Sequence, residues 1–271
     1  MVGQPSCPGP RGDARHPVLV LATLALLLLP GRSARAEDAR ALLAESEARH
    51  RSRTQEYSGE LTVFASGGRV RKKAWSSYRE GYAGDARQLI RFNDPPEVKG
   101  VGFLSLAHPG KNPDQWLYLP SMKRERRIAA QDRESSFVGT DFNYEDMEEF
   151  DHRKYEVSQA SEERLADAAC WRIEARPREP SVYQKRILWL RKDNLYLVQV
   201  ESYKKGASSP AKRFLLSDLA EVDGHQVARR LEMTSLEKGS RTVVLLNKIA
   251  FDRVPPPDRF TLQNLNREGG D

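Results

Sequence analysis

Residues 115–128 read Gln115-Trp116-Leu117-Tyr118-Leu119-Pro120-Ser121-Met122-Lys123-Arg124-Glu125-Arg126-Arg127-Ile128, and they form the core of the most informative part of the chain. Apolar and aromatic residues alternate with polar ones up to Pro120, and a basic run follows the proline turn. Because neighbouring side chains of a strand point to opposite faces, such a pattern predicts strands that bury one face. We therefore expect strands at residues 115–119 and 124–129.

The same alternation recurs along most of the chain. A helix is expected first, because Ala39, Leu42, Leu43 and Ser46 have helical spacing. Further strands are expected at residues 57–63, 70–78, 88–92, 101–106, 155–158, 170–175, 185–190, 195–203, 212–220, 227–233 and 243–251. A sheet of about a dozen strands must curl or close, because large flat sheets are unstable. The predicted fold class is mainly β, with a single large curled antiparallel sheet or barrel in one domain.

One face of each strand should point inward. The alternating positions that we assign inward include Leu61, Val63, Leu104, Leu106, Trp116, Tyr118, Ile187, Trp189, Leu195, Leu197, Leu215 and Leu219. A curled sheet of this size encloses more space than side chains fill, which predicts an apolar cavity suited to an acyl chain. The alternative is a packed core, because alternation marks burial and not vacancy. The candidate lipid-binding cleft consists of Leu104, Leu106, Trp116, Tyr118, Ile187 and Trp189.

Two segments carry a family resemblance: Trp116-Leu117-Tyr118-Leu119-Pro120 and Gly139-Thr140-Asp141-Phe142-Asn143-Tyr144-Glu145-Asp146-Met147. Together with the tail Arg259-Phe260-Thr261, they resemble the LolA-like family of periplasmic carriers, also known as outer-membrane lipoprotein-sorting proteins. The central stretch is most similar to the branch associated with export pumps of the resistance-nodulation type. The resemblance implies an incompletely closed β-barrel capped by short helices, whose concave apolar face binds lipid or the acyl chains of a lipoprotein.

The N-terminal segment has the features of a secretory signal peptide. Arginines precede a twelve-residue apolar run at Val18–Leu29, and Ala34-Arg35-Ala36 supplies small residues for cleavage. A membrane anchor is the alternative, but a spanning helix needs about 20 residues. We expect cleavage after Ala36, which leaves a LolA-like lipid-binding β domain at 37–271 that is periplasmic and does not span the membrane. Cleavage lowers the net charge from +6 to +3, well short of the strongly basic balance of a nucleic-acid binder.

Catalytic and cofactor-binding motifs are missing from the sequence. The histidines are scattered, and neither a nucleophile elbow nor a phosphate-binding glycine loop occurs. Cys170, beside Trp171, is expected to be a buried apolar residue and not a reactive thiol. The acidic cluster at 141–151, next to His152, lacks the spacing of a calcium loop and favours a solvated turn. We therefore expect no enzymatic activity, no cofactor and no metal.

Residues 137–147 are predicted to form a mobile lid. Gly139 allows unusual backbone angles, and Thr140 or Asp141 can cap a short helix at residues 143–149. Four residues would present an apolar side to the cleft: Phe137, Phe142, Tyr144 and Met147. The alternative is a static connector whose aromatic side chains plug the end of the barrel.

The basic run supplies a candidate rim for an anionic head group. Arg124 and Arg126 share one face of the expected strand, and guanidinium groups bind anions in a bidentate manner. Two alternatives stay open. The run can be a charged face that keeps the sheet soluble, or it can pair with the acidic cluster and hold the lid in place.

These features predict a non-enzymatic periplasmic carrier. It would bind an amphipathic lipid or lipoprotein cargo in the apolar cleft and pass it across the envelope, with an inner-membrane transporter as a candidate partner. The alternative is a packed β-barrel scaffold or adaptor that docks to an envelope transporter or sensor.

Overall fold

A computed structural model of the chain describes residues 38–267, so the predicted signal peptide at 1–36 lies outside the described residues. The described part is mainly β and contains one antiparallel sheet of fourteen strands. The strands are β1 Thr54–Phe64, β2 Val70–Glu80, β3 Arg87–Asp94, β4 Gly102–His108, β5 Lys111–Leu119, β6 Arg124–Arg127, β7 Tyr155–Val157, β8 Ser161–Leu165, β9 Ala168–Pro177, β10 Tyr183–Arg191, β11 Leu197–Lys204, β12 Lys212–Val222, β13 His225–Ser235 and β14 Ser240–Phe251. The predicted fold class is confirmed.

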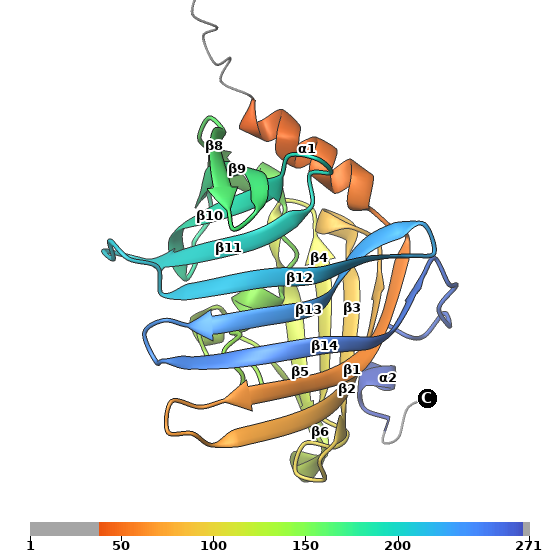
Figure 1. Cartoon of the computed structure of the whole chain (residues 1–271). Helices are drawn as coiled ribbons and strands as arrows, with labels where there is room; N and C mark the ends of the chain where they lie inside the picture. Colours follow the sequence, from red (N-terminus) through yellow and green to blue (C-terminus); the bar gives the residue numbers. More distant parts are fainter. Residues whose placement is uncertain (1–37, 268–271) are drawn as a thin grey trace, which may run out of the picture. The chain divides into compact units, whose positions relative to one another are not determined.

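The sheet is open, and its first and last strands pair near its middle. The strand order is β6-β5-β4-β3-β2-β1-β14-β13-β12-β11-β10-β9-β7, with β8 also paired to β9. Most neighbours are consecutive in sequence and are joined by tight turns, as antiparallel pairing allows. The pairing of β1 with β14 joins the two runs of hairpins into a single sheet (Figure 1). Within the described residues, β6 and β7 are edge strands, so the barrel is incompletely closed.

Helices are few and short. Helix α1 (Ala39–His50) begins at Asp38, whose carboxylate accepts a hydrogen bond from the amide of Arg40 at 2.9 Å. Its buried side chains Ala39, Leu42 and Leu43 pack in one cluster with apolar residues of β9 and β10. The short helix α2 (Leu262–Leu265) lies near the C-terminus, and 3-10 turns occur at Ala83–Asp85, Pro120–Met122, Ala130–Asp132, Glu145–Met147 and His152–Lys154. No helix within residues 38–267 has the length and apolar character needed to cross a membrane.

The sheet curls strongly enough for distant strands to face each other. Ile90 of β3 and Phe214 of β12 line the same cavity, although four strands lie between them in the sheet. We call the side of the sheet that carries these residues the inner face and the opposite side the outer face. The largest apolar cluster lies on the inner face and joins residues of β1–β4 to residues of β13 and β14.

Most predicted strands are confirmed, and the differences have local causes. Leu195 was expected to begin a strand, but its φ of 59° places it in a turn, and β11 begins at Leu197. Strand β8 was missed because its sequence, Ser-Glu-Glu-Arg-Leu, is almost wholly exposed at an edge and shows no alternation. The expected lid helix at 143–149 is a single 3-10 turn at Glu145–Met147. Tyr144 occupies the N-cap position, and its side chain makes no capping hydrogen bond.

Candidate functional site

The segment between the two sheet edges runs across the inner face. Residues 128–151, here called the inner loop, connect β6 to the turn before β7. The carbonyl oxygen of Tyr144 accepts a hydrogen bond at 3.1 Å from Gln115 of β5, and Phe142 lies 5.6 Å from Phe214 of β12. The carboxylate of Asp141 accepts a hydrogen bond at 2.7 Å from Thr242 of β14. The inner loop therefore contacts strands from both halves of the curled sheet.

Aromatic side chains of the inner loop fill the centre of the inner-face cluster. The ring of Phe137 lies 5.1 Å from Phe103 and 6.0 Å from Phe92, and only 3% of Phe137 is exposed. Tyr144 packs edge-on against Phe137 at 5.8 Å. Such edge-to-face contacts add to the stabilisation from apolar burial. Two of the four predicted lid residues, Phe137 and Tyr144, are therefore core residues in this structure.

A tight turn carries these aromatics. The amide of Phe137 donates to the carbonyl of Phe142 at 2.8 Å, and Thr140 donates through its amide and its hydroxyl to the carbonyl of Phe137. Val138 and Gly139 both have positive φ angles, 47° and 69°. Glycine adopts this conformation readily, whereas a β-branched residue such as valine is strained in it. The predicted unusual backbone at Gly139 is confirmed, and Val138 shares it.

Buried ion pairs anchor the second half of the inner loop. Glu145, which is 3% exposed, lies 3.3 Å from Arg133 and 3.6 Å from Arg186 of β10, and it accepts the amide of Val182 at 2.9 Å. Asp146 pairs with Lys212 of β12 at 2.7 Å. Burial opposes the charge of Arg186, but Tyr155, Asp146 and Glu145 outweigh it and raise the pKa of Arg186 above its usual value. This charge network fixes residues 145–149 against the sheet.

The acidic cluster does not pair with the basic run of β6. Besides the contacts of Glu145 and Asp146, Glu149 pairs with Arg79 of β2. Arg126 pairs instead with Asp132, and Arg127 pairs with Asp114. The hypothesis that residues 123–127 hold the acidic cluster in place is therefore wrong, because cations of β2, β10, β12 and the inner loop itself lie closer. The solvated acidic turn is also wrong for Glu145, which is buried.

Two adjoining cavities lie on the inner face beside the loop. One, of about 430 Å³, lies beneath α1 and is lined at one end by Leu43, Glu47, His50 and His152. The other, of about 230 Å³, is mainly apolar and includes Phe137, Phe142 and Met147, three of the predicted lid residues, in its lining. Both are lined by the shared residues Tyr57, Gln88, Phe214, Leu231 and Leu246. Ligand pockets commonly measure about 300–1,000 Å³, and the first cavity falls in that range.

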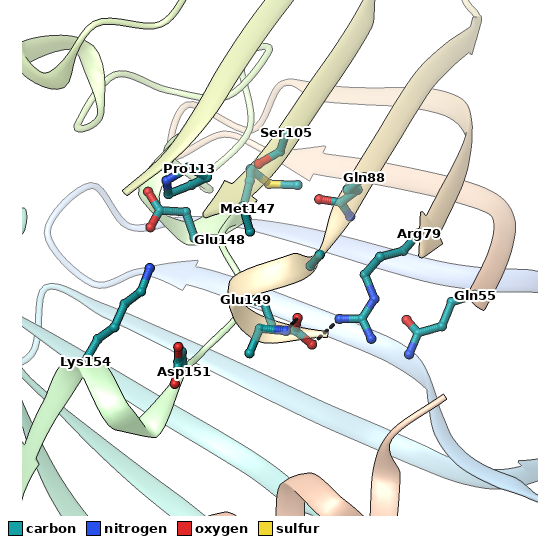
Figure 2. A pocket seen from close by; sticks show the side chains of 13 residues that line it. Gln55, Arg79, Gln88, Ser105, Pro113, Met147, Glu148, Glu149, Asp151 and Lys154 are labelled. Carbon is teal, nitrogen blue, oxygen red and sulfur yellow. Dashed lines mark hydrogen bonds and ion pairs between the residues drawn. The ribbon is translucent and has the colours of Figure 1, made fainter. Parts of the chain in front are cut away.

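A third, polar pocket of about 180 Å³ opens beside the apolar cavity. Figure 2 shows its side chains, with the ion pair between Arg79 and Glu149 on one side and Lys154 and Asp151 on the other. Gln88 and Met147 line this pocket as well as the apolar cavity. A continuous path of lining residues therefore leads from charged groups to an apolar interior, which is the arrangement that an amphipathic ligand requires.

The six residues assigned to the cleft lie on the outer face and line none of these three spaces. Leu104 and Tyr118 are buried in a cluster with Phe260 and Leu265, against which Leu106 and Trp116 also pack. Ile187 and Trp189 belong to a second outer cluster, with Cys170 and Tyr203. On the same strands the inner positions are Phe103 of β4 and Leu188 and Leu190 of β10.

The reason for this difference is the phase of the alternation. Apolar residues occupy both faces of β4 and β10. On β4, α2 and the C-terminal tail cover the outer face. On β10, the outer residues Ile187 and Trp189 pack with side chains of β8, β9 and β11. A Cβ atom on Gly102 would lie only 2.8 Å from the side chain of Leu265, which shows how closely α2 approaches β4. A period of two separates the faces but does not identify which one borders the cavity.

The predicted rim arginines lie at an edge of the sheet. Arg124 and Arg126 stand directly opposite Leu119 and Leu117 in the β5–β6 register, so they share the inner side of the sheet. Both are exposed, and neither lines the cavities. Cys170 is fully buried, and burial raises the pKa of its thiol, in keeping with the apolar role expected for it.

Several cavity residues were missed at the sequence level. Among them are Trp75, Phe92 and Phe214, which line the apolar cavity from β2, β3 and β12. Trp75 belongs to the expected strand 70–78, where Lys73, Trp75 and Ser77 alternate, so the signal was present but mixed with charged residues. Within residues 38–267, no group of three or more His, Cys, Asp or Glu side chains is arranged to hold a metal ion.

An open, curled antiparallel sheet with an apolar inner face defines the class of lipoprotein-sorting, LolA-type folds. A family model described as an uncharacterized protein matches residues 84–267, so the chain belongs to that family. The solved structures described next show that its fold is LolA-like. No curated protein matches the chain.

Solved structures of three proteins share this fold. A domain assigned to outer membrane lipoprotein sorting, from Vibrio parahaemolyticus, has 25% identity and a TM-score of 0.80, and the match covers 86% of this chain and 100% of that one. A DUF1329 family protein from Desulfovibrio piger has 23% identity and a TM-score of 0.79, covering 83% and 97% of the two chains. A LolA superfamily protein from Nitrosomonas europaea has 18% identity and a TM-score of 0.67, covering 83% and 98%.

Proposed function

We propose that this protein is a non-enzymatic periplasmic carrier that binds the acyl chains of an amphipathic lipid or lipoprotein on the inner face of its sheet. The observation that carries the proposal is the pair of adjoining cavities that share Tyr57, Gln88, Phe214, Leu231 and Leu246. Each buried methylene contributes about 0.8 kcal/mol, so a single chain in this space supplies useful affinity. The likeness to a lipoprotein-sorting domain supports the same ligand class.

The residues proposed to contact the acyl chain differ from those predicted from the apolar–polar alternation of the strands alone. They are the apolar lining residues Leu61, Trp75, Ile90, Phe92, Phe142, Met147, Phe214, Leu231, Val244 and Leu246. The same proposal includes export with cleavage after Ala36 and a single mature domain at 37–271. It also includes transfer of the ligand to or from an inner-membrane transporter. A head-group contact by Arg124 and Arg126 also stays a prediction.

Binding of an uncharged acyl probe tests the proposal. The methyl ester of parinaric acid fluoresces when its chain enters an apolar site, and we expect saturable binding to the wild-type protein. Leu231→Trp places a large side chain where the two cavities meet and should weaken binding by at least about tenfold. Leu215→Trp is the matched control, since Leu215 lies on the outer face of the adjacent strand β12. Equal binding by both variants would contradict the site.

A scaffold that docks to an envelope transporter or sensor is the second candidate. The observation that favours it is the clamped inner loop, whose aromatic rings already occupy the centre of the inner face. A wild-type protein that excludes the ester probe at all concentrations, and that yields no lipid by mass spectrometry after gentle purification, would favour the scaffold over the carrier.

A further inference from the structure

Lys73 is a buried cation at the border of the apolar cavity. It stands directly opposite Leu61 in the β1–β2 register, and Leu61 lines that cavity, so Lys73 shares the inner face. Only 7% of Lys73 is exposed, and its Nζ lies 5.5 Å from the centre of the Phe92 ring, another lining residue. The ammonium group is therefore next to the apolar space and largely withdrawn from solvent.

The hydrogen-bonding capacity of this ammonium is mostly unused. Its Nζ donates to the carbonyl of Val138 in the strained turn of the inner loop. Among residues 38–267, no carboxylate lies within ion-pairing distance of Lys73. An ammonium has three donors, and a buried charge without an anion is costly. Lys73 thus lacks the partner that the other buried cations of the inner face possess, as Arg186 and Lys212 show.

A second donor without an acceptor lies two residues along the same strand. Trp75 lines the apolar cavity and is 9% exposed. Its indole Nε1 is buried and has no hydrogen-bond partner within the described part of the chain. A buried donor that stays unsatisfied costs about 1–3 kcal/mol. Two such donors on one face of β2 indicate a place for acceptor atoms that a ligand supplies.

From this arrangement we propose that the apolar cavity takes an acyl lipid with an anionic head group, a carboxylate or a phosphate, held by Lys73 Nζ with Trp75 Nε1 as a second donor. The inference deepens the proposed carrier function and rests on it. The acyl chain lies along Leu61, Ile90 and Phe214, and the head group replaces or shares the contact between Lys73 and the carbonyl of Val138. Loading therefore acts on the strained turn at Val138 and Gly139.

The charge state of Lys73 fits this role. Burial, with a smaller contribution from Arg71, lowers the pKa of Lys73 from 10.5 to about 8. The side chain is still mainly protonated at neutral pH, and a bound anion would raise its pKa again. Affinity for an anionic ligand should therefore fall as the pH rises above about 8, whereas affinity for an uncharged ligand should not change.

Two fluorescent probes with the same chain test the head-group site. Parinaric acid carries a carboxylate, and its methyl ester does not. We expect Lys73→Met to weaken binding of the acid by at least about tenfold and to leave the ester within about twofold. Trp75→Phe should weaken the acid by a smaller factor. Lys72→Met is the control, since Lys72 is exposed on the outer side of the same strand and should change neither probe.

Further measurements identify the chemistry of the head group. They also separate a failure of this inference from a failure of the proposed carrier function. Stronger displacement of parinaric acid by dodecyl phosphate than by dodecanoate would assign a phosphate as the preferred head group, and the reverse order would assign a carboxylate. A folded Lys73→Met variant that binds neither probe, or that binds both as the wild type does, would overturn the inference. The proposed carrier function would not be affected by either result. Absence of binding of either probe to the wild type would overturn the carrier as well.

The pH dependence of binding to the wild-type protein tests the same inference without any variant. The dissociation constant of the acid should rise about tenfold between pH 7 and pH 9.5, while that of the ester stays constant. A flat profile for the acid over this range would contradict a role for Lys73.

Discussion

The carboxylate of Glu145 lies 3.6 Å from the guanidinium of Arg186, and this buried contact ties the inner loop to β10. Removing one partner of a buried ion pair typically costs about 3–5 kcal/mol, because the other charge stays buried and unpaired. Arg186→Met should therefore lower the free energy of unfolding by about this amount, measured by urea denaturation. Arg178→Met is the control: Arg178 is exposed, lies 3.5 Å from Glu156, and should cost less than about 0.5 kcal/mol. Equal losses in the two variants would show that Glu145 and Arg186 do not anchor the loop.

Gly139 is expected to be sensitive to substitution. Its φ of 69° is unfavourable for any residue with a Cβ, so Gly139→Ala should destabilise the protein by about 1–2 kcal/mol. Gly67→Ala provides the matched comparison, because Gly67 has no positive φ and an added Cβ there would meet no atom within 4 Å. Thermal unfolding followed by circular dichroism gives both values. A neutral Gly139→Ala would mean that the turn at 137–140 rearranges at no cost.

Hydrogen exchange should divide the inner loop into two parts. The turn at 137–142 contains the strained Val138, whereas residues 145–149 are held by Glu145, Asp146 and Glu149 in ion pairs. We expect the turn to exchange faster than residues 145–149 in the empty protein and to slow when an acyl ligand binds. This outcome would limit the lid to the turn. Identical protection of both parts, with and without ligand, would make the whole loop a static connector.

Lys73 should give the empty protein a distinct dependence of stability on pH. Its pKa is about 8 in the fold and 10.5 in the unfolded chain, so the unfolded state binds more protons between these values. Stability therefore rises with pH through this window as the folded protein loses the penalty of a buried charge. The difference in free energy of unfolding between wild type and Lys73→Met should shift in favour of the wild type from pH 7.5 to pH 10. A difference that is constant with pH would contradict the burial of a charged Lys73.

Export predicts a defined N-terminus for the mature protein. Sequencing of protein isolated from the native envelope should begin at Glu37, directly after Ala34-Arg35-Ala36. Replacement of Ala34 and Ala36 by bulky residues should block processing, because signal peptidase sites need small side chains at these positions. Recovery of chains that start at Met1 from the soluble cytosolic fraction would contradict the prediction.

Most of the strands, the first helix and the fold class follow from local sequence patterns. Alternation of apolar and polar residues is a local property, and turns at Gly67-Gly68 and Asp223-Gly224 divide the chain into hairpins without reference to distant contacts. The helical spacing of Ala39, Leu42 and Leu43 likewise predicted α1. The number of strands then required a curled sheet, since a flat one of this size is unstable.

The side of the sheet that holds the cavity depends on long-range packing. Leu104 and Phe103 are neighbours in β4 and equally apolar, yet Leu104 packs beneath α2 and Phe103 packs on the inner loop. The choice depends on what covers each face, and the covering segments are more than twenty residues away in sequence. The partners of Glu145 and the isolation of Lys73 depend in the same way on strands brought together by the curl. Local pattern fixes the strands, and long-range packing assigns their faces and their charges.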